Sequence, residues 1–285
     1  MTRCGTVAIV GRPNAGKSTL LNALVGSHLA IVSPRPQSTR LPVVGVCTRG
    51  DTQAVLLDTP GLLDPGYALH RAMLDTVRDA LTRADVIVHL VDGADPDPEA
   101  LAAALRNLEL TVEPDRIVPV FTKTDLASPP PGQLGISAKD NAGIDHLWEE
   151  IRGRLPEGEF RHPEDDLSTQ PLRFFVTEAI REVAFAQLRE ELPYAIHAEV
   201  EEFRESSSPV YIRVTMYVER DSQKGIVLGK GGAQLRSLGT AARALLEPLI
   251  GGPVYLDLWV KVLKDWRRDV AVLRRLGFHV PDTVA

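Results

Sequence analysis

The 285-residue sequence lacks the features that stabilise secreted proteins and those that anchor membrane proteins. It has two cysteines, Cys4 and Cys47, which are too few for a disulfide framework or a cysteine-based metal cage. No apolar run approaches the ~20 residues needed to cross a bilayer, and the N-terminus shows no signal-peptide pattern. We therefore expect a cytoplasmic protein in which both cysteines are small apolar fillers.

A general excess of positive charge is also missing, since the net charge is −6. This balance argues against a non-specific polyanion binder. The charge is uneven, however. From Pro209 onward twelve lysines and arginines stand against seven acidic residues, so this part carries +5 and the preceding part −11. An acidic front and a basic tail indicate two regions with different tasks.

The most informative stretch reads GRPNAGKS, residues 11–18, and satisfies the phosphate-loop pattern. A β-branched apolar run at residues 6–10 precedes it, and leucines at helical spacing follow it. Strand, glycine loop and helix together predict backbone amides that point at an anion. Lys17 is expected to reach the β- and γ-phosphates of a nucleoside triphosphate, and the Ser18 hydroxyl to bind Mg²⁺.

Three further motifs follow at the ends of predicted strands. Asp58 to Gly61 reads DTPG, where a second Mg²⁺-organising carboxylate belongs, and Gly61 leaves room for an amide at the γ-phosphate. Residues 122–125 read TKTD, and residues 135–139 read GISAK. Strands alternate with helices throughout this part, so we expect an α/β domain: a mostly parallel sheet, helices on both faces, and ligand at the carboxyl ends of the strands.

These motifs, together with Thr39, occur in the order typical of the translation-factor-like G proteins, which the first half resembles. The resemblance implies that Asp125 selects guanine, that Lys123 lies over the base, and that the Ala138 amide meets the guanine oxygen. It assigns Mg²⁺ to Ser18, Thr39 and Asp58, and catalysis to Lys17, Thr39 and Gly61. The expected nucleotide-binding residues are Gly11, Asn14, Ala15, Gly16, Lys17, Ser18, Thr19, Asp58, Thr59, Pro60, Gly61, Leu62, Thr122, Lys123, Asp125, Ser137, Ala138 and Lys139.

The sequence departs from that family pattern at three places. Thr122 stands where an Asn is usual, as it does in dynamin-like GTPases, and predicts weaker guanine binding. The short span between Asp125 and Ser137 contains three prolines, so the helix ordinarily found there is expected to be missing. Leu62 occupies the position of the water-orienting Gln of Ras-like enzymes, so hydrolysis must use backbone, a cation or a partner.

Beyond a polar linker the pattern changes to helix, two strands, two helices and a strand, with Gly229-Lys230-Gly231-Gly232 between the two helices. This arrangement resembles a type II KH domain, an α+β fold whose G-x-x-G loop clamps single-stranded RNA. The expected RNA-binding residues are Gly229, Lys230, Gly231, Gly232 and Arg236. Trp259 is predicted to be a core aromatic, and Trp266 an anchor at the start of a helix.

Almost the whole chain resembles the bacterial Era GTPases, including the stretches GRPN at residues 11–14, PQSTR at 36–40 and LPY at 192–194. The resemblance implies a G domain over residues 1–160, a linker over 161–170, and a type II KH domain with a C-terminal helix over 171–285. It also implies binding of GTP or GDP with Mg²⁺, binding to the 3′ end of small-subunit (16S) rRNA rather than DNA, and a role in maturing the 30S ribosomal subunit. We expect a monomer, and leave open peripheral contact with the inner face of the cell membrane.

Two alternatives stay open. One is a constitutive RNA-binding adaptor with a vestigial GTPase domain, which Thr122, Leu62 and the missing helix favour. The other is a metabolic kinase, which the lack of an evident phosphoacceptor site disfavours. Asn14 raises a separate question, because potassium-activated GTPases carry an Asn there that helps to hold K⁺. It could instead brace its own loop.

Overall fold

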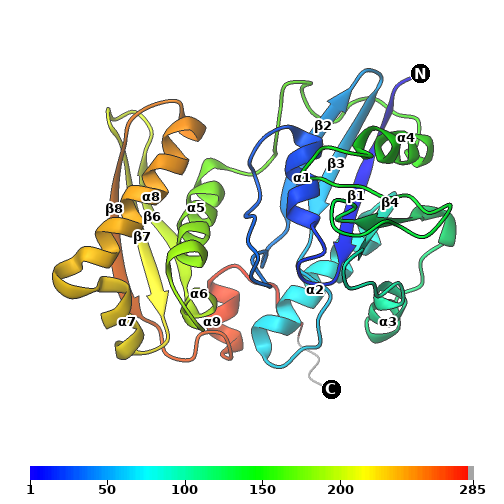
Figure 1. Ribbon diagram of the computed structural model, residues 1–285. Coiled ribbons are helices and arrows are strands. Elements are labelled where there is room, and N and C mark those ends of the chain that lie inside the picture. Colours follow the sequence, from blue (N-terminus) through cyan, green and yellow to red (C-terminus); the bar gives the residue numbers. More distant parts are fainter. Residues whose placement is uncertain (282–285) are drawn as a thin grey trace. The chain divides into compact units, whose positions relative to one another are not determined.

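The computed structural model describes residues 1–281, which form two compact units (Figure 1). The first spans Met1–Thr169 and also takes in residues 279–281; the second spans Gln170–Phe278. Residues 282–285, the end of the range predicted for the KH domain, lie outside the described residues. Within the described part of the chain, no helix is long and apolar enough to cross a membrane.

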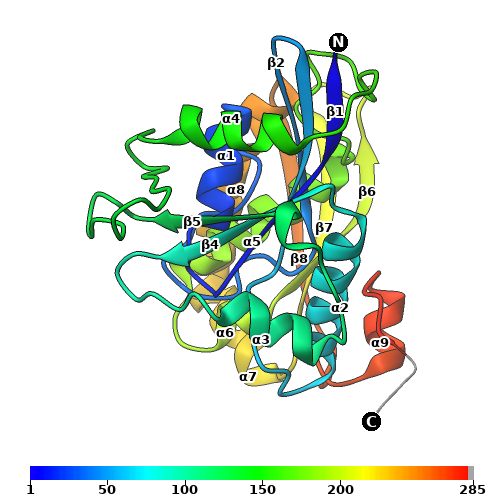
Figure 2. The same ribbon diagram turned by 90° about the vertical axis from the view of Figure 1, so that its right-hand side faces the viewer.

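The first unit is a five-stranded sheet with helices on both faces. Figure 2 shows α1 and α4 on one face and α2 and α3 on the other. The sheet order is β2-β3-β1-β4-β5, with β2 antiparallel to β3 and the other pairs parallel. Its elements are β1 (Arg3–Gly11), α1 (Lys17–Val25), β2 (Val43–Arg49), β3 (Thr52–Asp58), α2 (Ala68–Arg83), β4 (Val86–Asp92), α3 (Ala100–Asn107), η1 (Pro114–Arg116), β5 (Ile117–Thr122) and α4 (Ile144–Arg154).

The hydrophobic pattern explains why these strands lie at the centre. Every residue of β4 except Asp92 is buried, as a strand covered on both faces requires. Ile87 packs with Val77, Leu81 and Leu101 of the helices on one face. The carboxyl ends of β1, β3, β4 and β5 therefore meet at one edge, where the polar motifs follow.

The helix expected to be missing after β5 is absent: the structure has no helix between Thr122 and Ile144. Residues 134–136 instead run alongside the end of β5. The Phe121 amide donates to the Leu134 carbonyl at 2.8 Å, and the Ile136 amide donates to the Phe121 carbonyl at 2.8 Å. This short parallel pairing delivers Ser137 to the same edge of the sheet as the other motifs.

Part of the segment predicted as a linker is bound to the first unit. The buried side chain of Gln53 accepts hydrogen bonds from the amides of Arg161 and His162, at 2.9 and 3.0 Å. Further along, the Val46 amide donates to the Leu167 carbonyl at 2.9 Å. The chain therefore follows the β2–β3 side of the sheet up to the boundary near Thr169.

The second unit is a three-stranded sheet of order β6-β7-β8, with β6 and β7 antiparallel and β7 and β8 parallel. Its helices α5 and α8 pack together and share one apolar core with the sheet. The expected order of elements is confirmed, with short additions. These elements are α5 (Leu172–Gln187), α6 (Leu192–Ala195), β6 (His197–Arg204), β7 (Val210–Val218), α7 (Asp221–Leu228), η2 (Lys230–Gly232), α8 (Ala233–Ile250), β8 (Val254–Val262) and α9 (Val270–Arg275).

The two tryptophans of this unit have opposite environments. The prediction that Trp259 is a core aromatic is wrong, because its side chain is 53% exposed. It lies on the outer face of β8, since Leu258 and Val260 on either side of it turn toward the core. Trp266 is fully buried, and its indole N–H donates to the Ala195 carbonyl at 2.8 Å. Trp266 therefore anchors the turn that precedes α9.

Candidate functional site

The phosphate loop joins β1 to α1 and has the backbone conformation that its glycines predict. Gly16, at the N-terminus of α1, has φ of 91°, and a Cβ on Gly11 would lie 2.6 Å from the Leu90 carbonyl oxygen. The Lys17 ammonium donates to the carbonyls of Gly11 and Arg12 at 3.1 and 2.9 Å. Burial lowers the pKa of Lys17 to about 8, against the opposing effect of the Asp58 carboxylate. Anionic phosphates would compensate for the buried charge.

The three residues predicted to organise Mg²⁺ converge, although they come from α1, a loop and the end of β3. The Ser18 hydroxyl donates to Asp58 Oδ2 at 2.7 Å, and the Thr39 hydroxyl donates to the same oxygen at 3.1 Å. The two hydroxyl oxygens lie 3.2 Å apart. Two hydroxyls and a carboxylate suit Mg²⁺, which prefers oxygen ligands and completes its shell with phosphates and water. These residues therefore fit the metal.

The segment after Asp58 is held against the phosphate loop through its backbone. The Thr59 hydroxyl donates to the Ile9 carbonyl at 2.8 Å, and the Leu62 amide donates to the Gly11 carbonyl at 3.0 Å. A Cβ on Gly61 would lie 2.8 Å from the Pro13 nitrogen, so only glycine fits there. The Leu62 side chain is buried in the apolar cluster under α2 and α3 and does not line the cavity beside the phosphate loop. It cannot hold a water molecule.

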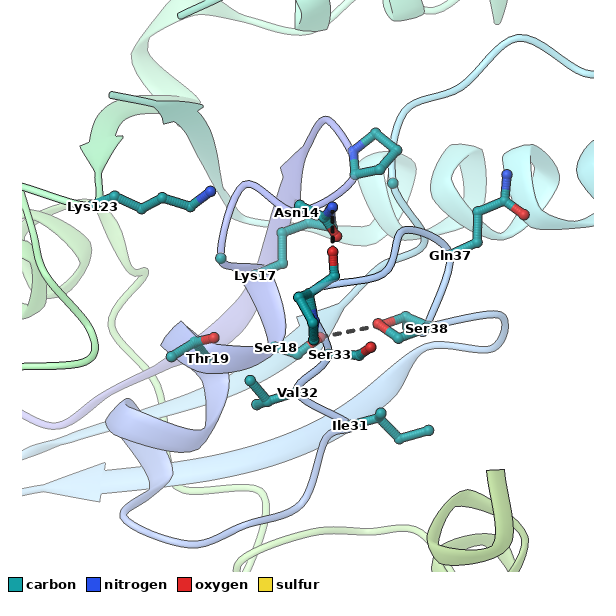
Figure 3. Close-up of a pocket in the computed structure, with 15 residues that line it drawn as sticks. Asn14, Lys17, Ser18, Thr19, Ile31, Val32, Ser33, Gln37, Ser38 and Lys123 are labelled. Atoms are coloured by element: carbon teal, nitrogen blue, oxygen red, sulfur yellow. Dashed lines mark hydrogen bonds between the residues drawn. The ribbon is translucent and has the colours of Figure 1, made fainter. Parts of the chain in front are cut away.

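Asn14 links the phosphate loop to the segment that carries Thr39. Its Nδ2 donates to the Pro34 carbonyl at 3.0 Å (Figure 3). Asn14 therefore does not brace its own loop. Both residues line a cavity of about 350 Å³, together with Lys17, Ser18 and Gly61. The cavity lies where the phosphates of a bound nucleotide are expected.

A second cavity, of about 390 Å³, adjoins the first and is lined mainly by apolar surface. Gly16, Thr19 and Lys123 belong to both. The TKTD and SAK motifs contribute Asp125 and Ala138, among others. The lining residues are Gly16, Thr19, Val32, Thr122, Lys123, Asp125, Leu126, Ala138 and Lys139. A flat, polar-edged base fits such a pocket, and the missing helix does not remove it.

Three contacts hold the base-selecting groups in place. The Ser137 hydroxyl lies 3.0 Å from Asp125 Oδ1 and 3.0 Å from Asp140 Oδ2. Lys123 forms an ion pair with Asp92 at the end of β4. Reasoning from sequence missed Asp92 and Asp140. The position of Asp92, at the end of a buried strand like that of Asp58, was the signal available for the first of them.

The second unit exposes the G-x-x-G loop between α7 and α8. Gly229, Gly231 and Gly232 have φ of 68°, 58° and 76°, a region that glycine reaches without strain. Lys230 is exposed beside them, and Arg236 Nη1 donates to the Gly231 carbonyl at 2.8 Å. The predicted RNA-binding residues therefore lie together on one exposed turn with two cations.

Comparisons with known proteins agree with this division. A family model described as 50S ribosome-binding GTPase matches residues 6–123, and a KH domain model matches residues 191–267. Fold and site thus define a P-loop GTPase followed by a KH domain. GTPase Era of Desulfovibrio desulfuricans is 39% identical over 96% of this chain and 97% of its own length. GTPase Era of a Nocardioides species is 42% identical over 97% and 96%. The chain belongs to the Era GTPase family.

Two solved structures match along nearly the whole chain. An Aquifex aeolicus Era variant bound to GDP and AlF4⁻ is 35% identical, with a TM-score of 0.90, covering 98% of this chain and all of its own. A second structure holds Era with MgGDPNP and nucleotides 1506–1542 of 16S ribosomal RNA. It is 34% identical, with a TM-score of 0.89 and the same coverage.

Proposed function

We propose that this protein binds GTP and GDP with Mg²⁺, hydrolyses GTP, and holds the 3′ region of 16S rRNA while promoting maturation of the 30S subunit. The observation that carries the proposal is the likeness of both units together to Era bound to MgGDPNP and to that RNA. The convergence of Ser18, Thr39 and Asp58 next to a base-sized pocket supports the nucleotide half.

In the proposed reaction the residues act mainly by position and charge. Bound Mg²⁺ would neutralise charge on the β- and γ-phosphates. Lys17 would move its donated hydrogen bonds from the carbonyls of Gly11 and Arg12 to phosphate oxygens. The Gly61 amide would meet the γ-phosphate, where its lack of a side chain permits close approach to Pro13. Contact of Thr39 and Gly61 with the γ-phosphate region would order two segments and so report which nucleotide is bound.

The RNA half of the proposal rests on the exposed glycine turn. Three glycines at positive φ leave the turn without side chains that would keep a phosphate away, and Lys230 and Arg236 add charge. A constitutive RNA-binding adaptor would share this turn. Turnover separates the two functions: purified protein should hydrolyse GTP in many cycles, with and without a 16S 3′-end RNA. Absence of turnover in both conditions would favour the adaptor.

The position of Asn14 favours a monovalent cation as the source of the catalytic charge that Leu62 does not provide. The side-chain Nδ2 of Asn14 hydrogen-bonds to the Pro34 carbonyl, which leaves Oδ1 as the amide atom able to bind a cation, and both residues line the phosphate cavity. Amide and carbonyl oxygens are the ligands that K⁺ takes in proteins. Asn14 would hold K⁺, whose charge would supply the role of an arginine finger, a contribution that reaches ~10³–10⁵ in rate.

This role predicts faster GTP hydrolysis in K⁺ than in Na⁺ at equal ionic strength, with Asn14→Ala removing the difference. Single-turnover hydrolysis in the two salts measures it. GDP affinity serves as the control, because a damaged fold would lower it in both salts. Equal rates for the unaltered protein in K⁺ and Na⁺ would assign Asn14 a structural role only.

We also propose that the protein is a monomer and works in the cytoplasm. Peripheral contact with the membrane stays a prediction. Light scattering tests the first, and flotation with vesicles of anionic phospholipid tests the second.

A further inference from the structure

Thr122 occupies an unusual position between the phosphate loop and the base pocket. It ends β5, is 4% exposed, and lines the pocket with Asp125 and Ala138. Its hydroxyl lies 2.9 Å from the Ala15 carbonyl oxygen and 3.4 Å from the Val91 carbonyl oxygen. The side chain thus joins the base-binding strand to the phosphate loop, 107 residues away in sequence.

The chemistry of these partners determines what Thr122 can offer a ligand. Both neighbours are carbonyl oxygens, which only accept hydrogen bonds. A threonine hydroxyl has a single hydrogen, so that hydrogen is used on the protein. What remains toward the pocket is lone-pair density and a methyl group. Thr122 therefore presents no donor to a bound base.

Guanine has three polar features beyond its sugar-linked edge: the N1–H and N2 donors, the O6 acceptor and the N7 acceptor. Asp125 would accept from the donors and the Ala138 amide would donate to O6. N7, next to O6 on the ring, then needs a donor from the remaining wall. Lys123 is engaged by Asp92, and Lys139 is exposed, which leaves Thr122 as the side chain at the end of β5 facing this region.

We propose that Thr122 is a positioning residue that ties the phosphate loop to the base site and leaves purine N7 unread. A guanine nucleotide in which a C–H replaces N7 should then bind as tightly as GDP. An Asn at position 122 would have two amide hydrogens, one for the Ala15 carbonyl and one for N7. With Thr122, the only hydroxyl hydrogen is donated to the protein's own Ala15 carbonyl, and none is left for N7. This inference rests on the proposed binding of guanine nucleotides.

The test is a competition titration of GDP and 7-deaza-GDP against a fluorescent GDP analogue, with Mg²⁺ present. In 7-deaza-GDP a C–H replaces N7, and the other polar groups are kept. The unaltered protein should bind the two within twofold. Thr122→Asn should bind GDP more tightly than 7-deaza-GDP by roughly 2- to 12-fold, the effect of one hydrogen bond.

Two further variants distinguish the role of Thr122 in positioning the base site from direct recognition of N7. Thr122→Val keeps the shape but loses the hydroxyl, and should weaken both ligands equally, because the bond to Ala15 is lost. Thr111→Asn makes the same chemical change as Thr122→Asn on an exposed residue, and should change neither affinity. A preference of the unaltered protein for GDP of more than twofold would overturn the inference while leaving guanine binding intact. Failure of GDP itself to bind would instead overturn the proposed function.

Discussion

The two units build their candidate sites in opposite ways. In the first unit several polar groups, Thr39, Asp58 and Thr122 among them, are buried and hydrogen-bonded: Asp58 accepts from Ser18 and Thr39, and Thr122 bonds to the Ala15 carbonyl. In the second unit the site is an exposed turn, made of backbone at positive φ with Lys230 and Arg236 beside it. The site of the first unit is therefore a network of side chains. The site of the second unit is a turn defined by its backbone conformation, with charged side chains beside it.

This difference predicts different sensitivities. A buried polar network is costly to disturb, because a lost partner leaves a desolvated group behind. An exposed phosphate clamp loses affinity by smaller steps, and its charge contacts weaken with salt. Substitutions should therefore change nucleotide binding steeply and RNA binding gradually, each without affecting the other ligand.

The largest effect is expected at Asp125. Asp125→Asn exchanges a pair of acceptors for an acceptor and a donor, so guanine loses two charge-assisted hydrogen bonds of about 1.5–3 kcal/mol each. GTP affinity should fall by ~10²–10⁴, while xanthosine triphosphate, whose 2-position oxygen accepts, should gain. Competition binding with GTP, XTP and ATP measures this. If the unaltered protein bound ATP as well as GTP, the guanine assignment would fail, and XTP binding by the variant checks that the first unit is still folded.

Thr122 and Trp259 show which features of the structure could be predicted from the sequence and which could not. The alternation of strands and helices follows from the hydrophobic period, and together with the order of the motifs it was sufficient for the G-domain fold. The exposure of Trp259 was also readable: Leu256, Leu258 and Val260 alternate with it along one strand. In this strand the alternation decides the position of Trp259, and the usual burial of aromatic residues does not.

Other features of the site had no sequence signal. The bonds from Thr122 to Ala15 and from Asn14 to Pro34 depend on how separate loops meet once the sheet is formed. The same is true of Gln53, which binds a segment more than a hundred residues away. A substitution such as Asn to Thr in a motif shows that something has changed. Only the neighbouring carbonyls show what the new side chain does.

An intermediate effect is expected at the glycine turn, and it sharpens the contrast between the units. A Cβ on Gly231 would meet open space, whereas a Cβ on Gly229 would lie 2.7 Å from the Gln234 Cβ. Gly231→Asp therefore tests phosphate approach rather than packing. RNA affinity should fall by the ~1–3 kcal/mol of an uncompensated contact, about 5- to 150-fold.

Filter binding of a 16S 3′-end RNA measures this loss, and GDP affinity is the control that should not change. Gly251→Asp supplies a matched change, at an exposed glycine of positive φ that ends α8 away from the turn. Unaltered RNA affinity in Gly231→Asp would reduce the G-x-x-G segment to a simple connection between helices.

The smallest effect concerns Lys17 and pH. Its pKa in the folded protein, about 8, lies below the ordinary 10.5, so Lys17 is half deprotonated near pH 8. The folded protein then binds fewer protons than the unfolded chain, and the penalty of the buried charge, present in full well below pH 8, is relieved as pH rises through 8 toward 10.5. Phosphate binding needs the charged form and opposes this loss.

GDP binding should therefore take up protons at alkaline pH and weaken about fourfold between pH 7 and 8.5, the ratio that a pKa near 8 gives. Calorimetry in two buffers of different ionisation heat detects the uptake directly, at roughly 0.8 proton at pH 8.5. The phosphates of GDP are almost fully ionised at pH 8.5 and release no proton on binding there, so they do not mask the uptake by Lys17. RNA binding to the exposed turn of the second unit, titrated in the same buffers, provides the comparison. Proton uptake of equal size with RNA, or none with GDP, would remove Lys17 as the cause and with it the contrast between a buried and an exposed phosphate site.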